Sequence, residues 1–147
     1  ARAGIVLMHM KGTPETMQEQ PHYDDVVLEV RAFLARAIAK AESSGVEGES
    51  ILVDPGIGFG KTLSHNLALL DRLPDLAELG KPLLVGSSRK SFIGRLVGDS
   101  PESRLMGTAA SVACAVLGGA SVVRVHDPRE MRDVVAVADA IRNERHA

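Results

Sequence analysis

The stretch Ile51-Leu52-Val53-Asp54-Pro55-Gly56-Ile57-Gly58-Phe59-Gly60-Lys61-Thr62 reads ILVDPGIGFGKT and joins an apolar run to a glycine-rich loop. The run at 51–53 predicts a buried strand, so the loop begins at the carboxyl end of that strand. The last three residues are also how a nucleotide-binding P-loop ends. The stretch therefore predicts a ligand-binding loop, and its spacing decides which kind of ligand.

That spacing argues against a nucleotide. In the pattern G-x-x-x-x-G-K-[ST] the first glycine falls at Pro55, which has a fixed φ and no backbone N–H for a phosphate. The dinucleotide-binding pattern G-x-G-x-x-G also fails, because Lys61 occupies its third glycine position. Asp54 is a further objection, since a carboxylate in front of the loop repels phosphate and suits a ligand that offers N–H donors.

Other apolar runs resemble this one, and a helical pattern follows each of them. Strands are expected at 5–8, 51–53, 83–85 and 121–125. The first helix is expected to start from an N-cap at Asp24 and to end at Gly45. Its inward face would carry Val27, Val30, Phe33, Leu34, Ala37 and Ile38. The next helix is marked by Leu67, Leu70 and Leu73 and is expected to end at Pro74. A third helix is expected over about 102–117. The last helix is expected over 130–142, and its inward face would carry Met131, Val134, Val135, Ala138 and Ile141.

This order of elements predicts an α/β fold with parallel strands. The strands are continuously apolar rather than alternating, which is typical of parallel sheets covered on both faces. An open doubly wound sheet and the second half of a (β/α)₈ TIM barrel both fit four βα units. A whole barrel takes about 250 residues, whereas this sequence has 147 and opens ARAGIVLMHM with almost no lead-in. The barrel alternative makes 1–147 a single partial domain, with the N-terminal half of the barrel absent.

Composition narrows the classes of partner. Apolar content of 45% and charged content of 24% are typical of a soluble globular protein. The net charge of −2, the absence of tryptophan and an aromatic content of 3% argue against nucleic-acid binding. No apolar run is long enough to cross a membrane and no signal peptide is visible. The single cysteine allows no disulfide within the chain, so a reducing, cytoplasmic location is expected. Cys114 lies in the run SVACAVLGGA and is interpreted as a buried, inert thiol.

Polar residues follow each expected strand, in the segments MHMKG, DPGIGFGK, GSSRKS and RVHD. Because α/β folds bind ligands at the carboxyl ends of their strands, we expect these segments to form one shared site. Asp54 either accepts hydrogen bonds from a ring N–H and an exocyclic amine or braces its own loop. Phe59 either covers an aromatic ligand or packs into the core.

The other two strand ends offer positive charge. Lys90 would supply a point charge to a carbonyl or an anion and Ser91 a hydroxyl, unless Arg89 and Lys90 are simply solvated loop charges. Arg124 and His126 alternate with valines and so share one face of a strand. We favour an anion site there over an exposed face, because parallel strands rarely show a face to water.

The remaining histidines suggest no chemistry. His9 has no Cys, Asp or Glu at metal-ligand spacing and is interpreted as a structural histidine. His22, His65 and His146 are interpreted as surface or capping groups. No metal ligand and no catalytic triad can be assigned from the sequence.

The motifs LMHMKGTPETMQ, DPGIGFGKT with the following HN, GSSRKSFIG and VRVHD, in that order, closely resemble the dihydropteroate synthase family from about Ile5 to Asp127. The resemblance implies the second half of a pterin-binding (β/α)₈ barrel. It also implies a transferase of folate biosynthesis that joins 4-aminobenzoate to 6-hydroxymethyl-7,8-dihydropterin pyrophosphate and releases pyrophosphate. Members of this family are targets of sulfonamides. The lack of an insertion near Phe59 suggests a drug-sensitive type.

The resemblance further implies a role for each matching residue. Asp54, Lys90, Gly86 and Met10 would bind the pterin, Phe59 and Ser91 the 4-aminobenzoate, and Arg124 and His126 the pyrophosphate. Mg²⁺ would assist, with its ligand supplied by the first half of the barrel, and intact members would form homodimers through late helices. Two alternatives stay open, a pterin-binding corrinoid-dependent methyltransferase and a non-catalytic half-barrel fragment that binds a partner chain.

Overall fold

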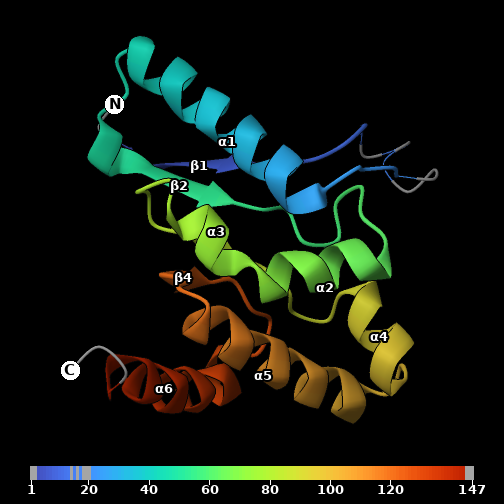
Figure 1. The fold of residues 1–147 in the computed structure, drawn as a ribbon. Helices are drawn as coiled ribbons and strands as arrows, with labels where there is room; N and C mark the ends of the chain where they lie inside the picture. The colour runs from blue at the N-terminus through green and yellow to red at the C-terminus, as the bar shows by residue number, and fades with distance from the viewer. Residues whose placement is uncertain (1–2, 14, 16, 18–20, 145–147) are drawn as a thin grey trace.

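A computed structural model describes residues 3–13, 15, 17 and 21–144. One or two α-helices follow each strand of the described chain, as expected for an α/β fold (Figure 1). The strands are β1 (Ile5–Met8), β2 (Ile51–Asp54), β3 (Leu84–Val85) and β4 (Val122–Val123). The α-helices are α1 (Val26–Ser43), α2 (Leu63–Asp71), α3 (Leu73–Ala77), α4 (Ser91–Val97), α5 (Pro101–Leu117) and α6 (Pro128–Glu144), and a 3₁₀ turn covers Gly48–Ser50.

All strand pairs are parallel. β1 pairs with β2 so that Ile5 lies opposite Ile51, and β3 pairs with β4 so that Leu84 lies opposite Val122. A parallel bridge between Val53 and Leu83 joins the two pairs. The strands therefore follow one another in space as they do in sequence, and their carboxyl ends lie along one edge.

Burial differs between the inner and the outer strands. β2 and β3 are covered on both faces, and Val53, Leu84 and Val85 are buried. β1 and β4 are not: Val6 is 45% exposed and Val122 is 39% exposed. The expectation that every strand is covered on both faces is therefore wrong for the outer pair, because each outer strand has a described neighbour on one side only.

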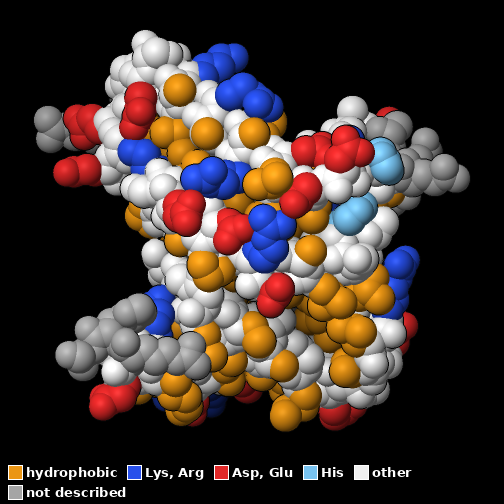
Figure 2. All heavy atoms as spheres, in the orientation of Figure 1, with side chains coloured by type: hydrophobic (Ala, Val, Ile, Leu, Met, Phe, Trp, Pro, Cys, Tyr) orange, Lys and Arg blue, Asp and Glu red, His pale blue; other side chains and the backbone are white. Residues whose placement is uncertain are grey.

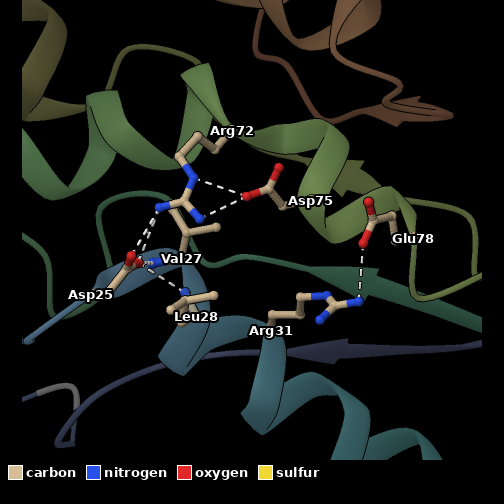
Figure 3. A network of polar contacts seen from close by, with 7 residues as sticks. All are labelled: Asp25, Val27, Leu28, Arg31, Arg72, Asp75 and Glu78. Carbon is tan, nitrogen blue, oxygen red and sulfur yellow. Dashed lines mark hydrogen bonds and ion pairs between the residues drawn. The ribbon is translucent and has the colours of Figure 1, made fainter.

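The first helix begins one residue later than the sequence suggests. Asp25, not Asp24, is the N-cap of α1, and its carboxylate accepts hydrogen bonds from the backbone N–H groups of Val27 and Leu28 (Figure 3). Both residues are good caps by type, so only the direction of the chain entering the helix distinguishes them. The end of α1 at Gly45 is confirmed, with φ of 88° there.

Two other helix expectations need correction. Pro74 does not end a helix; it lies in the first turn of α3, where its missing N–H is not needed. On α6, Met131 and Ala138 are buried but Ile141 is 46% exposed. The buried stripe of α6 is narrow because this helix packs mainly against α5. Phe33 on α1 is likewise at the surface, 36% exposed.

Candidate functional site

Asp54, at the carboxyl end of β2, lies at the centre of the strand-end loops. It is 1% exposed, and both of its oxygens have partners. Oδ1 accepts a hydrogen bond from the backbone N–H of Gly56 at 2.7 Å. Oδ2 accepts one from the guanidinium of Arg124 at 3.1 Å, across 70 residues of sequence. Asp54 thus braces its own loop and also contacts the end of β4.

The glycine-rich loop lies against the end of β1. Gly56 has φ of 69°, and a Cβ atom there would lie 1.9 Å from the carbonyl oxygen of His9. Only glycine allows this close approach of two backbones. At the other end of the loop, Thr62 and His65 cap α2 reciprocally, which confirms the interpretation of His65 as a capping group. The glycines therefore pack two strand-end loops together.

A cavity of about 180 Å³ lies between the ends of β3 and β4. In it, Nδ1 of His126 lies 3.0 Å from the hydroxyl of Ser88, and the backbone N–H of His126 donates to the same hydroxyl at 3.2 Å. The structure therefore brings together several residues that the sequence placed in one site. The cavity is lined by Gly86, Ser88, Lys90, Arg124, Val125 and His126.

The burial argument for Arg124 and His126 is wrong, although the two residues do share a cavity. The side chain of Arg124 is 54% exposed, and His126 is exposed. β4 ends at Val123, so both residues lie beyond the strand and outside its covered faces. Ser88, which contacts His126, was not predicted as a site residue.

Lys90 and Phe59 lie together next to Asp54. The ammonium of Lys90 donates to the carbonyl of Ile57 and lies 4.4 Å from the centre of the Phe59 ring. Burial lowers the pKa of Lys90 to about 8, with the Asp54 charge opposing this shift and the Arg124 charge adding to it. Phe59 is half-buried and lies outside the hydrophobic core, so its ring is available at the loop surface.

Lys61 is a residue that sequence reasoning missed. It is 4% exposed, and its ammonium lies 3.0 Å from Nδ1 of His9 and 3.0 Å from the carbonyl oxygen of Phe59. Burial lowers the pKa of Lys61 to about 7, and burial together with the Lys61 charge lowers the pKa of His9 to about 4. His9 is therefore a buried, hydrogen-bonded histidine, as interpreted from the sequence. The position of Lys61 directly after a glycine loop and before a helix cap was the available signal.

Ser91 and Met10 lie apart from the cavity at β3 and β4. Ser91 begins α4 and lines a separate cavity of about 100 Å³, together with Lys61, Asn66 and Arg95. Asn66 also holds the glycine loop, because its side-chain oxygen accepts from the N–H of Gly58 at 2.7 Å. Met10 is half-buried just beyond β1.

No three His, Cys, Asp or Glu side chains within the described ranges are placed to hold a metal ion. The resemblance assigns the Mg²⁺ ligand to the first half of the barrel, so Mg²⁺ binding stays a prediction. His22 is a surface group with its side chain 86% exposed, and His146 lies outside the described residues. None of the helices in the described part of the chain is long and apolar enough to span a membrane.

The interpretation of Cys114 as a buried thiol is wrong, because it is exposed on α5. It lines an apolar cavity of about 690 Å³ between α2, α3, α4 and α5, away from the strand-end loops. The run around Cys114 is apolar on every side of the helix, so its composition does not show which side packs inward.

The sequence is similar to a known protein family. The sequence profile described as "Pterin binding enzyme" matches residues 1–126. Dihydropteroate synthase of Escherichia coli (strain K12) is 48% identical over 146 residues, which cover 97% of this chain and 52% of that protein. The enzyme of Synechocystis sp. is 48% identical over 141 residues, covering 95% of this chain and 49% of that protein. The chain spans about half the length of these curated relatives.

Solved structures match over the same extent. Dihydropteroate synthase of Yersinia pestis, in a complex with a sulfonamide drug, superposes with a TM-score of 0.93 at 38% identity and covers 97% of this chain and 52% of that one. The enzyme of Xanthomonas albilineans in complex with 7,8-dihydropteroate gives a TM-score of 0.86 at 45% identity, covering 95% of this chain and 51% of that one.

Proposed function

Because the chain belongs to the pterin-binding enzyme family, we propose that it carries strand-end loops of a dihydropteroate synthase. The reaction joins 4-aminobenzoate to 6-hydroxymethyl-7,8-dihydropterin pyrophosphate and releases pyrophosphate. The observation that carries this proposal is the contact between Asp54 and Arg124, which joins a carboxylate for N–H donors to a cation for the leaving group. Relatives named dihydropteroate synthase at 48% identity support it.

We also propose that the four parallel strands are consecutive strands of a (β/α)₈ barrel. Their spatial order β1-β2-β3-β4, with a helical segment after each strand, supports this arrangement. The match of the chain to about half of each solved relative supports it as well. An open doubly wound sheet would instead change strand order at a switch point.

The proposed pterin subsite lies over Gly86, between β2 and β3. The Asp54 carboxylate accepts hydrogen bonds from a ring N–H and the exocyclic amine, and the Lys90 ammonium donates to the ring carbonyl. Gly86 leaves room for a flat ring because it has no side chain, and Met10 supplies an apolar contact. Asp54 is buried, so its charge acts at low dielectric on the positive charge that develops when the pterin loses its leaving group.

The other two subsites would flank the pterin. Arg124 and His126 hold the pyrophosphate, which leaves with the electrons of the C–O bond. The aniline nitrogen of 4-aminobenzoate then attacks the methylene carbon and loses a proton. Phe59 packs on the ring of 4-aminobenzoate, and Ser91 lies near its carboxylate. Holding the three groups in line lowers the entropic part of the barrier.

A binding measurement on this chain tests the proposal. We expect 6-hydroxymethyl-7,8-dihydropterin pyrophosphate to bind, and Asp54→Asn to weaken binding by about tenfold or more, because one buried charged acceptor is lost. Asp24→Asn, at a fully solvated carboxylate, is the matched control and should leave the dissociation constant unchanged.

Turnover is the second readout of the same proposal. Pyrophosphate release should require 4-aminobenzoate and should disappear in Asp54→Asn. Equal affinity of the wild-type chain and Asp54→Asn for the pterin would contradict the proposed role of this site.

A further inference from the structure

Arg124 occupies a position that the proposed pterin ring needs. Its guanidinium donates to Oδ2 of Asp54 at 3.1 Å, while Oδ1 of Asp54 is held by the N–H of Gly56. A heterocycle that donates two N–H groups to the Asp54 carboxylate therefore competes with Arg124 at Oδ2. Oδ1 remains bonded to its own loop and has a second lone pair for the ring.

The guanidinium also covers the surface on which the ring would lie. A Cβ atom at Gly86 would lie 3.0 Å from Nη2 and 3.1 Å from Nε of Arg124. The Nε and Nη2 edge of the guanidinium thus faces the space beside Gly86 where a side chain would begin. An open surface over Gly86 therefore depends on moving this one side chain, and the move also frees both lone pairs of Oδ2.

Arg124 has somewhere to move. Its side chain is 54% exposed. It lines the same cavity as His126, where the pyrophosphate group would lie. A phosphate oxygen competes well with a carboxylate for a guanidinium fork.

We infer that Arg124 is a specificity-determining residue that couples the pyrophosphate subsite to the pterin subsite, because the anion draws the guanidinium away from Asp54 and Gly86. This inference rests on the proposed function. A pterin that carries pyrophosphate brings the anion that opens its own subsite. A pterin without a leaving group must shift the guanidinium from beside Gly86 with no compensating partner, so the site discriminates against it.

Thermodynamic linkage sets how strongly the binding of pterin and the binding of pyrophosphate affect each other. If pyrophosphate favours the open position of Arg124, it tightens the binding of a simple pterin, and the pterin tightens the binding of pyrophosphate by the same factor. We expect a factor of about fivefold or more in the wild-type chain. 6-Methylpterin is a suitable probe, because it has the ring donors but no group that would overlap with free pyrophosphate.

The test is a binding cycle by titration calorimetry with 6-methylpterin and inorganic pyrophosphate. Arg124→Met keeps an unbranched side chain but has no donor, so it should bind 6-methylpterin alone more tightly than the wild-type chain, and pyrophosphate should no longer alter that affinity. His126→Gln is the matched control. This variant should weaken the binding of pyrophosphate. Saturating pyrophosphate should still tighten the binding of 6-methylpterin, because Arg124 remains.

A spectroscopic readout is independent of pterin binding. In the wild-type chain, pyrophosphate alone should shift the ¹⁵Nε–H resonance of Arg124 toward its position in Asp54→Asn, where the partner charge is removed. This readout holds even if Arg124→Met does not fold.

The binding results distinguish a failure of the coupling from a failure of the proposed function. If 6-methylpterin binds but its affinity is the same with and without pyrophosphate, the coupling is wrong and the proposed function stands. If the pterin binds to no form of the chain, the proposed function fails and the coupling fails with it.

Discussion

Lys61 and His9 form a buried ionisable pair beside the proposed site. The Lys61 ammonium donates to Nδ1 of His9 and to the carbonyl of Phe59, so it ties the glycine loop of β2 to the end of β1. Burial disfavours the charged form of both groups, and the pKa of Lys61 falls to about 7 and that of His9 to about 4. At neutral pH His9 is therefore uncharged and accepts a hydrogen bond.

These pKa values predict how stability changes with pH. Between about pH 7 and 10.5 the unfolded chain holds a proton on Lys61 that the folded chain has lost, so the free energy of unfolding should rise with pH, by at most about 5 kcal/mol. Between pH 6.5 and about 4 the unfolded chain protonates His9 first, so stability should fall as the pH falls. Urea unfolding at a series of pH values measures both effects.

The variant Lys61→Met distinguishes the Lys61 contribution to the pH dependence from that of Lys90. The rise between pH 7 and 8 should disappear in this variant, and the rise above pH 8 should shrink to the part that Lys90 contributes. An unchanged profile in Lys61→Met would show that Lys61 keeps its ordinary pKa.

The close backbone contact at Gly56 predicts a loss of stability when this glycine is replaced. Gly56→Ala would place a methyl group 1.9 Å from the carbonyl oxygen of His9 in a backbone with φ of 69°, and we expect a loss of at least about 3 kcal/mol in the free energy of unfolding. Gly45→Ala is the matched control, since Gly45 has φ of 88° but nothing within 4 Å of the added atom. Its loss should be about 1–2 kcal/mol, from the left-handed conformation alone. Equal losses at the two positions would contradict the packing argument.

At the scale of elements, a polar network fastens the start of α1 to α3. Figure 3 shows Arg72 between the carboxylates of Asp25 and Asp75, at 3.0 Å and 2.8 Å. The backbone N–H of Leu28 and the Arg72 side chain hold the pKa of Asp25 below its usual value. One side chain thus caps α1 and also joins it to the loop between α2 and α3.

Asp25→Ala removes both contacts. We expect it to lower the thermal midpoint by roughly 3–5 °C, because the cap and the ion pair are lost together. Asp24→Ala is the control, since the side chain of Asp24 is 98% exposed and caps no helix. Circular dichroism at 222 nm measures both variants, and a larger effect from Asp24→Ala would show that the helix starts one residue earlier.

At the scale of the whole molecule, apolar side chains gather away from the strand ends. Figure 2 shows hydrophobic groups on the face where α2 and α4 lie. The apolar cavity of about 690 Å³ opens there, and its lining includes Leu67, Leu96 and Val97, which are 40%, 54% and 50% exposed. Apolar patches of this kind favour association in water.

We therefore expect the chain to self-associate in a concentration-dependent manner through this face. Leu96→Glu should weaken association by about tenfold or more, because one apolar side chain is no longer buried and charges are brought together. Leu28→Glu is the matched control, since Leu28 is also 54% exposed but lies on α1. Sedimentation equilibrium decides: a wild-type chain that stays monomeric at 15.6 kDa at every concentration contradicts the prediction.

Particular residues show how far sequence reasoning reached. The order of strands and helices and the presence of Asp54, Lys90, Arg124 and His126 at strand ends follow from local patterns, and the structure places them there. Their exposure was not predictable in the same way. Arg124 is more exposed than a strand position suggests, because β4 ends before it and has a described neighbour on one side only.

The sequence by itself determined the succession of βα units, the glycine positions and the set of polar groups at one edge, because hydrophobic periodicity and turn preferences act over a few residues. Only the tertiary structure decided which of those groups touch. The Asp54–Arg124 contact spans 70 residues and the His9–Lys61 contact 52. Such contacts depend on how the loops of separate strands pack, and distance, burial and pKa are properties of that packing rather than of either segment alone.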